Sequence, residues 1–316
     1  MHLKSLTALV AVVALTACGS SGGDDGASTK QQQITVGVIP IANSAPIYLG
    51  QQQGFFSDEG IDLKLIEESG GAAAVPGVVS GNFNFSFGNL VSVITARSQG
   101  IPLKTVVSAI SSTGKPGHDV SAVLVKKDSP IKSAADLAGR TVAVNNLKNV
   151  GDMTVSATVR KNGGDPSKIK FVEMAFPNML AALAKGRVDA VWEVEPFVTV
   201  GQSNDARAVA WNYAEAAPDL LIGVYFTSEK MIKKNPDLVK RFVAAFEKSK
   251  AYARANPEEV RKVLLTYTKI DNKIAQKMNM PVWPKTLKEN DMQTVADLML
   301  QEGLLTKKFN ASQLLP

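Results

Sequence analysis

A-V-N-N-L-K-N-V-G-D-M, at residues 143–153, is where an apolar run breaks into polar residues and a helix then begins. The run it ends, T-V-A-V at residues 141–144, is apolar and β-branched enough to favour a buried strand. A strand that passes through a short loop into a helix is the repeating unit of α/β proteins. Because ligands of such proteins gather beyond the carboxyl ends of the strands, this stretch predicts one half of a binding site.

The same alternation of strand and helix runs through most of the chain. Short apolar runs predict strands at residues 34–40, 61–67, 83–87, 104–109, 119–126, 140–144, 169–173, 188–192, 206–211 and 221–227. Amphipathic or small-residue stretches between them predict helices at residues 45–56, 71–80, 90–99, 133–137, 151–161 and 177–185. After residue 227 the pattern is helical, and its longest element is predicted at residues 236–255. This order is typical of an α/β protein with largely parallel sheets.

The size of the folded part predicts two lobes. It begins near Ile34 and keeps roughly 280 residues, which is large for a single core. The ending K-K-D-S-P after the strand at 119–126 predicts an exit into a second lobe at residues 127–227. The helical tail is expected to pack on the first lobe, which would then comprise residues 34–126 and 228–316. Two crossings, near Lys126 and Thr227, would form a hinge around a cleft suited to closing on a small ligand.

The N-terminal residues predict export and lipid anchoring. Lys4 precedes an apolar run at residues 6–15, about half of the ~20 residues that a membrane-spanning helix needs, so residues 1–17 are interpreted as a signal peptide. L-T-A-C at residues 15–18 matches a lipobox, which predicts lipidation of Cys18 at the outer face of the cytoplasmic membrane. Residues 18–33 have no apolar side chain larger than Ala beyond Cys18, and they predict a flexible tether.

Several function classes are disfavoured by composition. Cys18 is the only cysteine, which excludes an intramolecular disulfide, and the only histidines are His2 and His118, which excludes a histidine-rich metal site once the signal is removed. The net charge of +6 is spread over the chain, so no nucleic-acid surface is predicted. No motif pairs a nucleophile with a base, so we expect no enzymatic activity and no cofactor. His118 could line the cleft or lie solvated in a loop. The protein is expected to be a monomer.

Six segments resemble a known family of binding proteins. They are V-G-V-I-P-I-A-N-S-A-P-I-Y-L-G-Q-Q-Q-G-F-F-S-D-E-G-I-D-L at 36–63, S-G-G-A-A-A-V-P-G-V-V-S-G at 69–81, F-S-F-G-N at 85–89, S-A-A-D-L-A-G-R-T-V-A-V at 133–144, A-L-A-K-G-R-V-D-A-V-W at 182–192 and E-P-F at 195–197. In order and content they are similar to the nitrate/sulfonate/taurine-binding proteins of ABC importers, whose relatives bind pyrimidine precursors of thiamine. The resemblance implies a two-lobed periplasmic-binding fold (type II) with two crossovers and a five-stranded sheet in each lobe. It also implies an ABC permease with a cytoplasmic ATPase as partners.

Five loops at predicted strand ends supply the candidate ligand-binding residues. These are Asn43, Ser44, Ser69, Gly70, Gly71, Asn89, Asn145, Asn146, Lys148, Asn149, Trp192 and Glu193. Several have a second interpretation: the asparagines and serines could only cap helices, Trp192 could only pack in the core, and Lys148 could only be solvated. Capping and binding are compatible, because a helix N-terminus offers free N–H groups and partial positive charge to an anion.

The ligand class remains open between two chemistries. A small organic anion, a sulfonate or carboxylate, is favoured by helix N-termini at the cleft, by Lys148 and by the basic chain. No arginine lies in the five loops, however, so no bidentate clamp is visible. An amino-pyrimidine or other heteroaromatic vitamin precursor is the alternative, stacked on Trp192 and hydrogen-bonded to Glu193. A sensory lipoprotein without a transport role is an alternative class. The expected mechanism is capture of the ligand by hinge closure.

Overall fold

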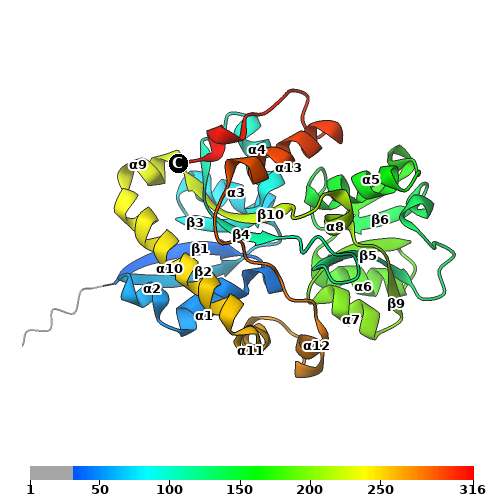
Figure 1. The fold of residues 1–316 in the computed structure, drawn as a ribbon, viewed down its shortest axis with the longest axis horizontal. Helices are drawn as coiled ribbons and strands as arrows, with labels where there is room; N and C mark the ends of the chain where they lie inside the picture. Colours follow the sequence, from blue (N-terminus) through cyan, green and yellow to red (C-terminus); the bar gives the residue numbers. More distant parts are fainter. Residues whose placement is uncertain (1–30) are drawn as a thin grey trace, which may run out of the picture. The chain divides into compact units, whose positions relative to one another are not determined.

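Two mixed β-sheets, each with one strand that runs against its neighbours, form the framework of the protein. The computed structural model describes residues 31–316, which form one compact unit. Each sheet carries its own set of helices (Figure 1), so the predicted α/β class and two-lobed architecture are confirmed. The signal peptide predicted at residues 1–17 lies outside the described residues, as does most of the tether predicted at residues 18–33.

The first sheet has the strand order β2-β1-β3-β10-β4. Its strands are β1 (Gln32–Val38), β2 (Ile61–Glu67), β3 (Phe85–Asn89), β4 (Leu103–Ser111) and β10 (Leu221–Ser228). The β1 strand is parallel to β2 and β3, whereas β10 is antiparallel to β3 and β4. The parallel strands β1 and β3 thus end at the same edge of the sheet, where loops meet helix N-termini.

The second sheet repeats this plan with the strand order β7-β6-β8-β5-β9. Its strands are β5 (Ser121–Lys126), β6 (Thr141–Val144), β7 (Lys170–Glu173), β8 (Ala190–Val194) and β9 (Ala206–Ala210). Here β6 is parallel to β7 and β8, and β5 is antiparallel to β8 and β9. In each sheet, the antiparallel strand is the one that the chain enters directly after it crosses from the other sheet.

The crossings differ from the predicted ones, which lay near Lys126 and Thr227. The β5 strand, predicted in the first lobe, belongs to the second sheet, and β10, predicted in the second lobe, belongs to the first. The chain crosses instead at residues 112–120 and 211–220. Both strands are buried along nearly their whole length, so their apolar pattern suits either sheet and only tertiary pairing decides between them. The division into residues 34–126 plus 228–316 and 127–227 is corrected accordingly.

Helices α1 to α8 cover the two sheets. Those of the first lobe are α1 (Ala45–Gln52), α2 (Phe55–Asp58), α3 (Gly71–Ser80) and α4 (Leu90–Ser98), after a 3-10 turn at Ala42–Ser44. Those of the second lobe are α5 (Val150–Lys161), α6 (Phe176–Ala184), α7 (Phe197–Ser203) and α8 (Asn212–Ala216), with 3-10 turns at Ala134–Leu137 and Pro166–Lys168. The predicted helices therefore recur, with ends shifted by a few residues.

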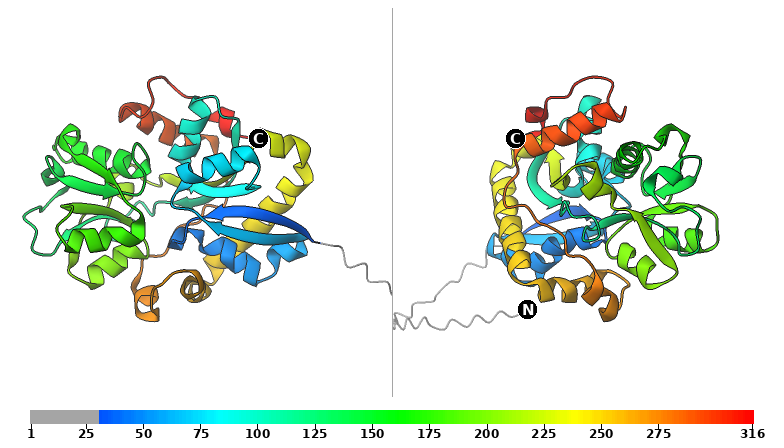
Figure 2. Two further views of the ribbon diagram at one scale, coloured as in Figure 1. Left: turned by 180° about the vertical axis from the view of Figure 1, so that it is seen from behind. Right: turned by 45° about the vertical axis from the view of Figure 1, so that its right-hand side comes forward.

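The C-terminal tail is helical, as its pattern predicted. It comprises α9 (Glu229–Lys234), α10 (Pro236–Ala255), α11 (Pro257–Tyr267), α12 (Asn272–Lys277), α13 (Glu289–Gln301) and a 3-10 turn at Ala311–Leu314. Most of it packs on the first lobe: α10 lies along α1, α2 and β4, and α13 lies against α4 (Figure 2). The short helix α12 instead reaches α7 of the second lobe. Within residues 31–316, no helix has the length and apolar character that crossing a membrane requires.

Candidate functional site

A small cavity lies where the carboxyl edges of the two sheets meet. The first lobe lines it with Ile39, Ile41, Asn43, Phe87, Asn89, Ile222 and Gly223. The second lobe lines it with Asn145, Val150, Phe176, Trp192, Val194 and Tyr213. Its volume is about 20 Å³, enough for one or two water molecules. A larger molecule can therefore enter only when the lobes move apart.

Three asparagines supply the amide groups of the cavity wall. Asn43 follows β1, Asn89 is the last residue of β3, and Asn145 follows β6. Each stands at the end of a strand that is parallel to a neighbour, so the topology brings the three to one edge although they are far apart in sequence. All three were predicted as site residues, and the structure brings them together.

Two of these amides have an oxygen with no hydrogen-bond partner in the described part of the chain. They are Oδ1 of Asn43 and Oδ1 of Asn145, and both side chains are buried. The amide nitrogen of Asn145 is already engaged, because it donates to the carbonyl of Ser69 at 3.2 Å. A buried acceptor without a donor is unfavourable by about 1–3 kcal/mol. The cavity therefore presents acceptors from both lobes to any ligand that carries N–H or O–H donors.

Two of the helix N-termini near the cavity, those of α4 and α5, are already capped by side chains. Asn89 Oδ1 accepts from the backbone N–H of Ser92 at 2.9 Å at the start of α4. At the start of α5, Asn149 Oδ1 accepts from the N–H of Val150, and the Asp152 carboxylate accepts from the N–H groups of Lys148 and Asn149. The carboxylate of Asp152 thus occupies the place that an anionic ligand would take at α5.

The aromatic wall of the cavity is built around Trp192. Its ring is buried, lies 5.4 Å from the ring of Phe176 and 6.0 Å from that of Tyr213, and its Nε1 donates to Ser121 Oγ at 2.7 Å. A Cβ on Gly151 would lie 2.4 Å from Cε3 of this indole, so the start of α5 rests on the ring. Trp192 therefore packs in the core and also lines the cavity.

Glu193 does not line the cavity, although it was predicted as a site residue. Adjacent residues of a strand point to opposite faces, so Glu193 turns away from the face of Trp192. Its cross-strand partner Ala122 shares its face with Leu124, which packs beneath Gly201 of α7. The carboxyl group is fully buried, and within residues 31–316 neither of its oxygens has a hydrogen-bond partner. Burial disfavours the charged form and raises the pKa of Glu193 well above its usual value.

Other predicted residues lie at the rim or outside it. Lys148 is exposed, adopts a left-handed backbone with φ 51°, and is not part of the lining. Ser44 is buried but does not line the cavity. His118 is exposed in the first crossing. Neither the Ser44 nor the Lys148 side chain is part of the cavity wall.

Most of the remaining predicted residues bring the two lobes into direct contact. Asn149 Nδ2 donates to Ser92 Oγ at 3.0 Å, and this bond joins the caps of α5 and α4. Close approach of the lobes also depends on Gly70, because a Cβ there would lie 2.1 Å from Oδ1 of Asn146. Gly71 packs within the first lobe, where a Cβ would lie 2.8 Å from the Cα of Gly88 and so bring α3 close to β3. These residues shape the closed interface next to the cavity rather than its wall.

The apolar residues of the wall were missed by sequence reasoning. Phe87, Phe176 and Tyr213 line the cavity, but nothing in the sequence around them distinguishes them from residues of the core. Phe176 and Tyr213 stand in the first turns of α6 and α8, and helix starts at strand ends could have drawn attention to them.

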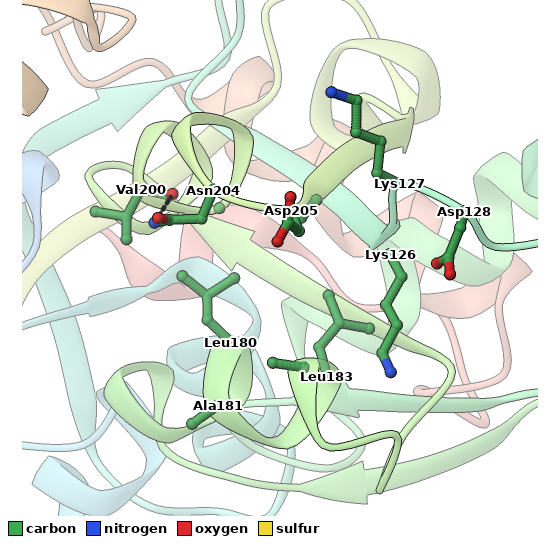
Figure 3. Close-up of a pocket in the computed structure, with 12 residues that line it drawn as sticks. Lys126, Lys127, Asp128, Leu180, Ala181, Leu183, Val200, Asn204 and Asp205 are labelled. Atoms are coloured by element: carbon green, nitrogen blue, oxygen red, sulfur yellow. Dashed lines mark hydrogen bonds between the residues drawn. The ribbon is translucent and has the colours of Figure 1, made fainter.

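A larger groove lies on the outer surface of the second lobe, between α6 and α7 (Figure 3). Its volume is about 890 Å³, and Leu180, Leu183 and Val200 form its apolar walls near Lys126 and Asp205. Its lining comes from one lobe, and none of its side chains is among the buried polar groups without a partner in the described chain. The interlobe cavity is therefore the stronger candidate despite its smaller size.

Comparison with known proteins finds one matching family and relatives that are named as binding proteins or as synthases. The family model described as "NMT1/THI5 like" matches residues 41–260. The formylaminopyrimidine-binding protein of Halalkalibacterium halodurans is 23% identical over 270 residues, which cover 83% of this chain and 78% of that protein. The putative aliphatic sulfonates-binding protein of Bacillus subtilis is 23% identical over 318 residues, which cover 97% and 92%.

Two further relatives bear on fold and chemistry. The alkanesulfonate-binding protein SsuA from Xanthomonas axonopodis pv. citri, solved with bound MOPS, superposes with a TM-score of 0.75 at 17% identity, covering 90% of this chain and 98% of that one. This likeness shows the periplasmic-binding fold. A 4-amino-5-hydroxymethyl-2-methylpyrimidine phosphate synthase of Saccharomyces cerevisiae is 21% identical, covering 75% of this chain and 72% of that protein.

Proposed function

The chain belongs to the NMT1/THI5-like family, and from this premise we propose that it is the substrate-binding component of an ABC importer for a small heteroaromatic ligand of the amino-pyrimidine class. The observation that carries the ligand class is the pair of unpartnered oxygens, on Asn43 and Asn145, in an aromatic cavity. Exocyclic amino groups supply the N–H donors that these oxygens lack, and a flat ring suits the wall formed by Trp192 and Phe176.

A small organic anion, which the sequence favoured, fits the site less well. Among the described residues that line the cavity there is no lysine, arginine or histidine. Lys148 is turned to solvent, and capping side chains already bind N–H groups at the starts of α4 and α5. A sulfonate or carboxylate transferred there from water would lose hydration without gaining a countercharge. The proposal therefore adopts the amino-pyrimidine alternative that the sequence left open. The hydrogen-bond acceptors are the amide oxygens of Asn43 and Asn145, whereas the sequence had suggested Glu193.

The proposed mechanism is capture by closure of the lobes. A ligand bonded to Asn43 in the first lobe and to Asn145 in the second makes both bonds only when the lobes are together. A ligand shifts a conformational equilibrium only through such differential contacts. The closed protein would then deliver its ligand to a membrane permease with a cytoplasmic ATPase.

Binding without turnover is part of the proposal, although the yeast relative is named as a synthase. The polar side chains of the cavity wall are amides and the Tyr213 phenol, whose pKa burial raises well above its usual value. None of these groups is a general base at pH 7. Conversion of an amino-pyrimidine by the purified protein would contradict this part, and a sensory role without transport would require that no permease partner be found.

Isothermal titration with four ligand classes tests the ligand assignment. The probes are a 4-amino-pyrimidine with a 5-hydroxymethyl group, ethanesulfonate, nitrate and benzoate. We expect micromolar or tighter binding of the amino-pyrimidine and at least 100-fold weaker binding of the three anions. Tight binding of ethanesulfonate with no response to the amino-pyrimidine would overturn the proposal and restore the anion hypothesis.

Anchoring of a monomer through a lipid on Cys18 completes the proposal, supported by the lipobox at residues 15–18. The substitution Cys18→Ser should release the protein from membranes of the producing cell while ligand binding is retained. Membrane fractionation followed by mass spectrometry of the mature N-terminus measures both the location and the lipid. A wild-type N-terminus without an acyl group would contradict the assignment.

A further inference from the structure

One segment of the C-terminal tail contacts both lobes. This strap, residues 272–284, consists of α12 and the extended chain after it. The α12 helix lies against α7 of the second lobe (Figure 1), whereas Val282 pairs with Ser111 at the end of β4 in the first sheet. The strap therefore spans the hinge as a third element beside the two chain crossings.

Cationic side chains fasten the strap to the first lobe. Lys250 of α10 donates to the carbonyl of Pro284 at 2.8 Å, and Arg254 donates to that of Trp283 at 3.1 Å. Arg261 of α11 donates to the carbonyl of Ala275. Lys250 is fully buried and also bonds to the carbonyl of Ser108 on β4, so this end of the strap is held from both sides. Removing any one of these cations would leave the others in place.

Apolar packing also holds the strap on the first lobe. Met278 and Trp283 are buried in one cluster with Ala42, Ala45 and Leu49 of the first lobe. Burial of side chains of this size contributes about 1.5–3 kcal/mol each. With three cations and a strand bridge added, the strap moves with the first lobe when the lobes separate.

Two hydrogen bonds from Asn279, which lies between these anchors, join the strap to the first crossing and to the second lobe. Its backbone N–H donates to Glu195 Oε1 at 3.1 Å, and its Nδ2 donates to the carbonyl of Asp119 at 2.9 Å. Asp119 lies in the first crossing, and Glu195 directly follows β8 of the second sheet. Beyond these bonds, contact between the strap and the second lobe comes from α12 against α7. The attachment to the second lobe is thus the weaker of the two, and it is where the strap would release.

The release point is next to the ligand cavity. Glu195 follows Val194, which lines the cavity, and its carbonyl accepts from the N–H of Ala42 in the first lobe at 2.9 Å. Ala42 in turn precedes Asn43. One junction therefore joins the strap, the end of β8 and the first-lobe loop that carries a proposed ligand contact.

We propose that the strap, residues 272–284, is a closure latch: it stays bound to the first lobe, and it binds the second lobe through Asn279 when the cleft closes. Asn279 acts as a positioning residue, since it does not line the cavity and holds the loop that does. The latch rests on the hinge closure of the proposed function but does not depend on which ligand is bound.

Spin-label distances between the lobes test the latch without a ligand. Labels at Lys64 and Lys170, both exposed and on opposite sheets, are introduced in a Cys18→Ser background. Asn279→Ala removes the bond to Asp119, whereas Asn279→Pro also removes the N–H that Glu195 accepts; Met278, with ψ 150°, is already in the extended region that precedes proline. We expect the closed-to-open ratio to fall about fivefold for Asn279→Ala and further for Asn279→Pro. Asn290→Ala, on the exposed face of α13, is the matched control and should leave the ratio unchanged.

The outcomes separate the latch from the proposed function. A distance distribution that is the same for both Asn279 variants and the control, with far-ultraviolet circular dichroism and thermal unfolding showing that all are folded, overturns the latch. A graded shift toward open distances supports it, even if titration with every ligand class is negative and the proposed ligand has to be abandoned. If the amino-pyrimidine binds, both Asn279 variants should also weaken its binding, by the same factor as the shift.

Discussion

The backbone of Gly151 lies against the indole of Trp192 so closely that a Cβ atom there would be 2.4 Å from Cε3 of the ring. This contact fixes the first turn of α5 in the second lobe relative to the aromatic wall of the cavity. It also explains why a glycine stands in the first turn of α5, after the polar loop that begins at Asn145: any larger residue would push the helix start and the indole apart. The path of the chain from Asn145 to α5 therefore depends on a residue that has no side chain.

Gly151→Ala should disturb the cavity although alanine is the better helix former. The added methyl group must displace Trp192 or the start of α5, and overpacking of this kind is destabilising by about 1–3 kcal/mol. We expect urea unfolding to show this loss of unfolding free energy, and we expect at least a tenfold weaker affinity for the amino-pyrimidine. Ser156→Ala, farther along α5, is the control and should change neither quantity. An unchanged affinity would mean that the ligand does not contact this wall.

Asn145→Ala separates binding from folding. The amide oxygen has no partner in the described structure, so its removal relieves a buried acceptor, whereas the bond from Nδ2 to Ser69 is lost. The two effects oppose each other, and we expect the free energy of unfolding to change by less than about 1 kcal/mol. Affinity for the amino-pyrimidine should fall at least tenfold. Calorimetry of this variant beside the exposed control Asn82→Ala measures the difference, and equal affinities would remove Asn145 from the site.

Glu195 should make stability depend on pH. Its carboxylate accepts from the N–H and Oγ1 of Thr199 at 3.1 and 2.8 Å, but burial dominates and raises its pKa from 4.5 to about 7, although Arg261 of α11 acts to lower it. Between these values the folded state binds more protons than the unfolded state, so the contribution of Glu195 to stability is greatest below pH 4.5. It falls as the pH rises toward 7 and is constant above, a total of roughly 3 kcal/mol.

Glu195→Gln tests that pH dependence. The variant keeps an oxygen that accepts from Thr199 and cannot ionise. The difference in unfolding free energy between variant and wild type should therefore grow from pH 5 to pH 7 in favour of the variant and then level off. Urea unfolding at half-unit steps from pH 5 to pH 9 measures it. A difference independent of pH would show that Glu195 titrates near its ordinary value in the folded protein.

The fold was largely predictable from the sequence because its signals are local. β-branched runs and amphipathic stretches mark strands and helices, and the loop at Asn145 lies at a strand end wherever that strand is placed. Local sequence does not determine which sheet β5 and β10 join, because both strands are buried along nearly their whole length and either sheet could pair with them. The same limit applies to the strap, whose contact between Asn279 and Glu195 joins residues 84 apart.

Part of the site was predictable and was still assigned wrongly. Trp192 and Glu193 are neighbours on a strand, and the period of two places only one of them on the face of the cavity. That Phe176 and Tyr213 complete the wall could not be read from the sequence, because apolar residues at helix starts look the same whether they face a core or a cavity. Polar loop residues were therefore easier to find than the aromatic surface between them.

Glu193→Met should stabilise the protein and leave ligand binding unchanged. The carboxyl group is buried without a hydrogen-bond partner among residues 31–316, on the face of β8 that is turned toward α7. Methionine has a similar length and fills the same space with no polar atom to desolvate, so we expect a gain of about 1–3 kcal/mol at pH 7. Glu193→Gln, which keeps two polar atoms in the same place, should gain less. Urea unfolding and calorimetry with the amino-pyrimidine measure the two properties separately. If Glu193→Met instead abolished binding while the protein remained folded, the carboxyl group would have to reach the ligand in the open or closed form, and the two unpartnered asparagine oxygens would no longer account for the ligand class.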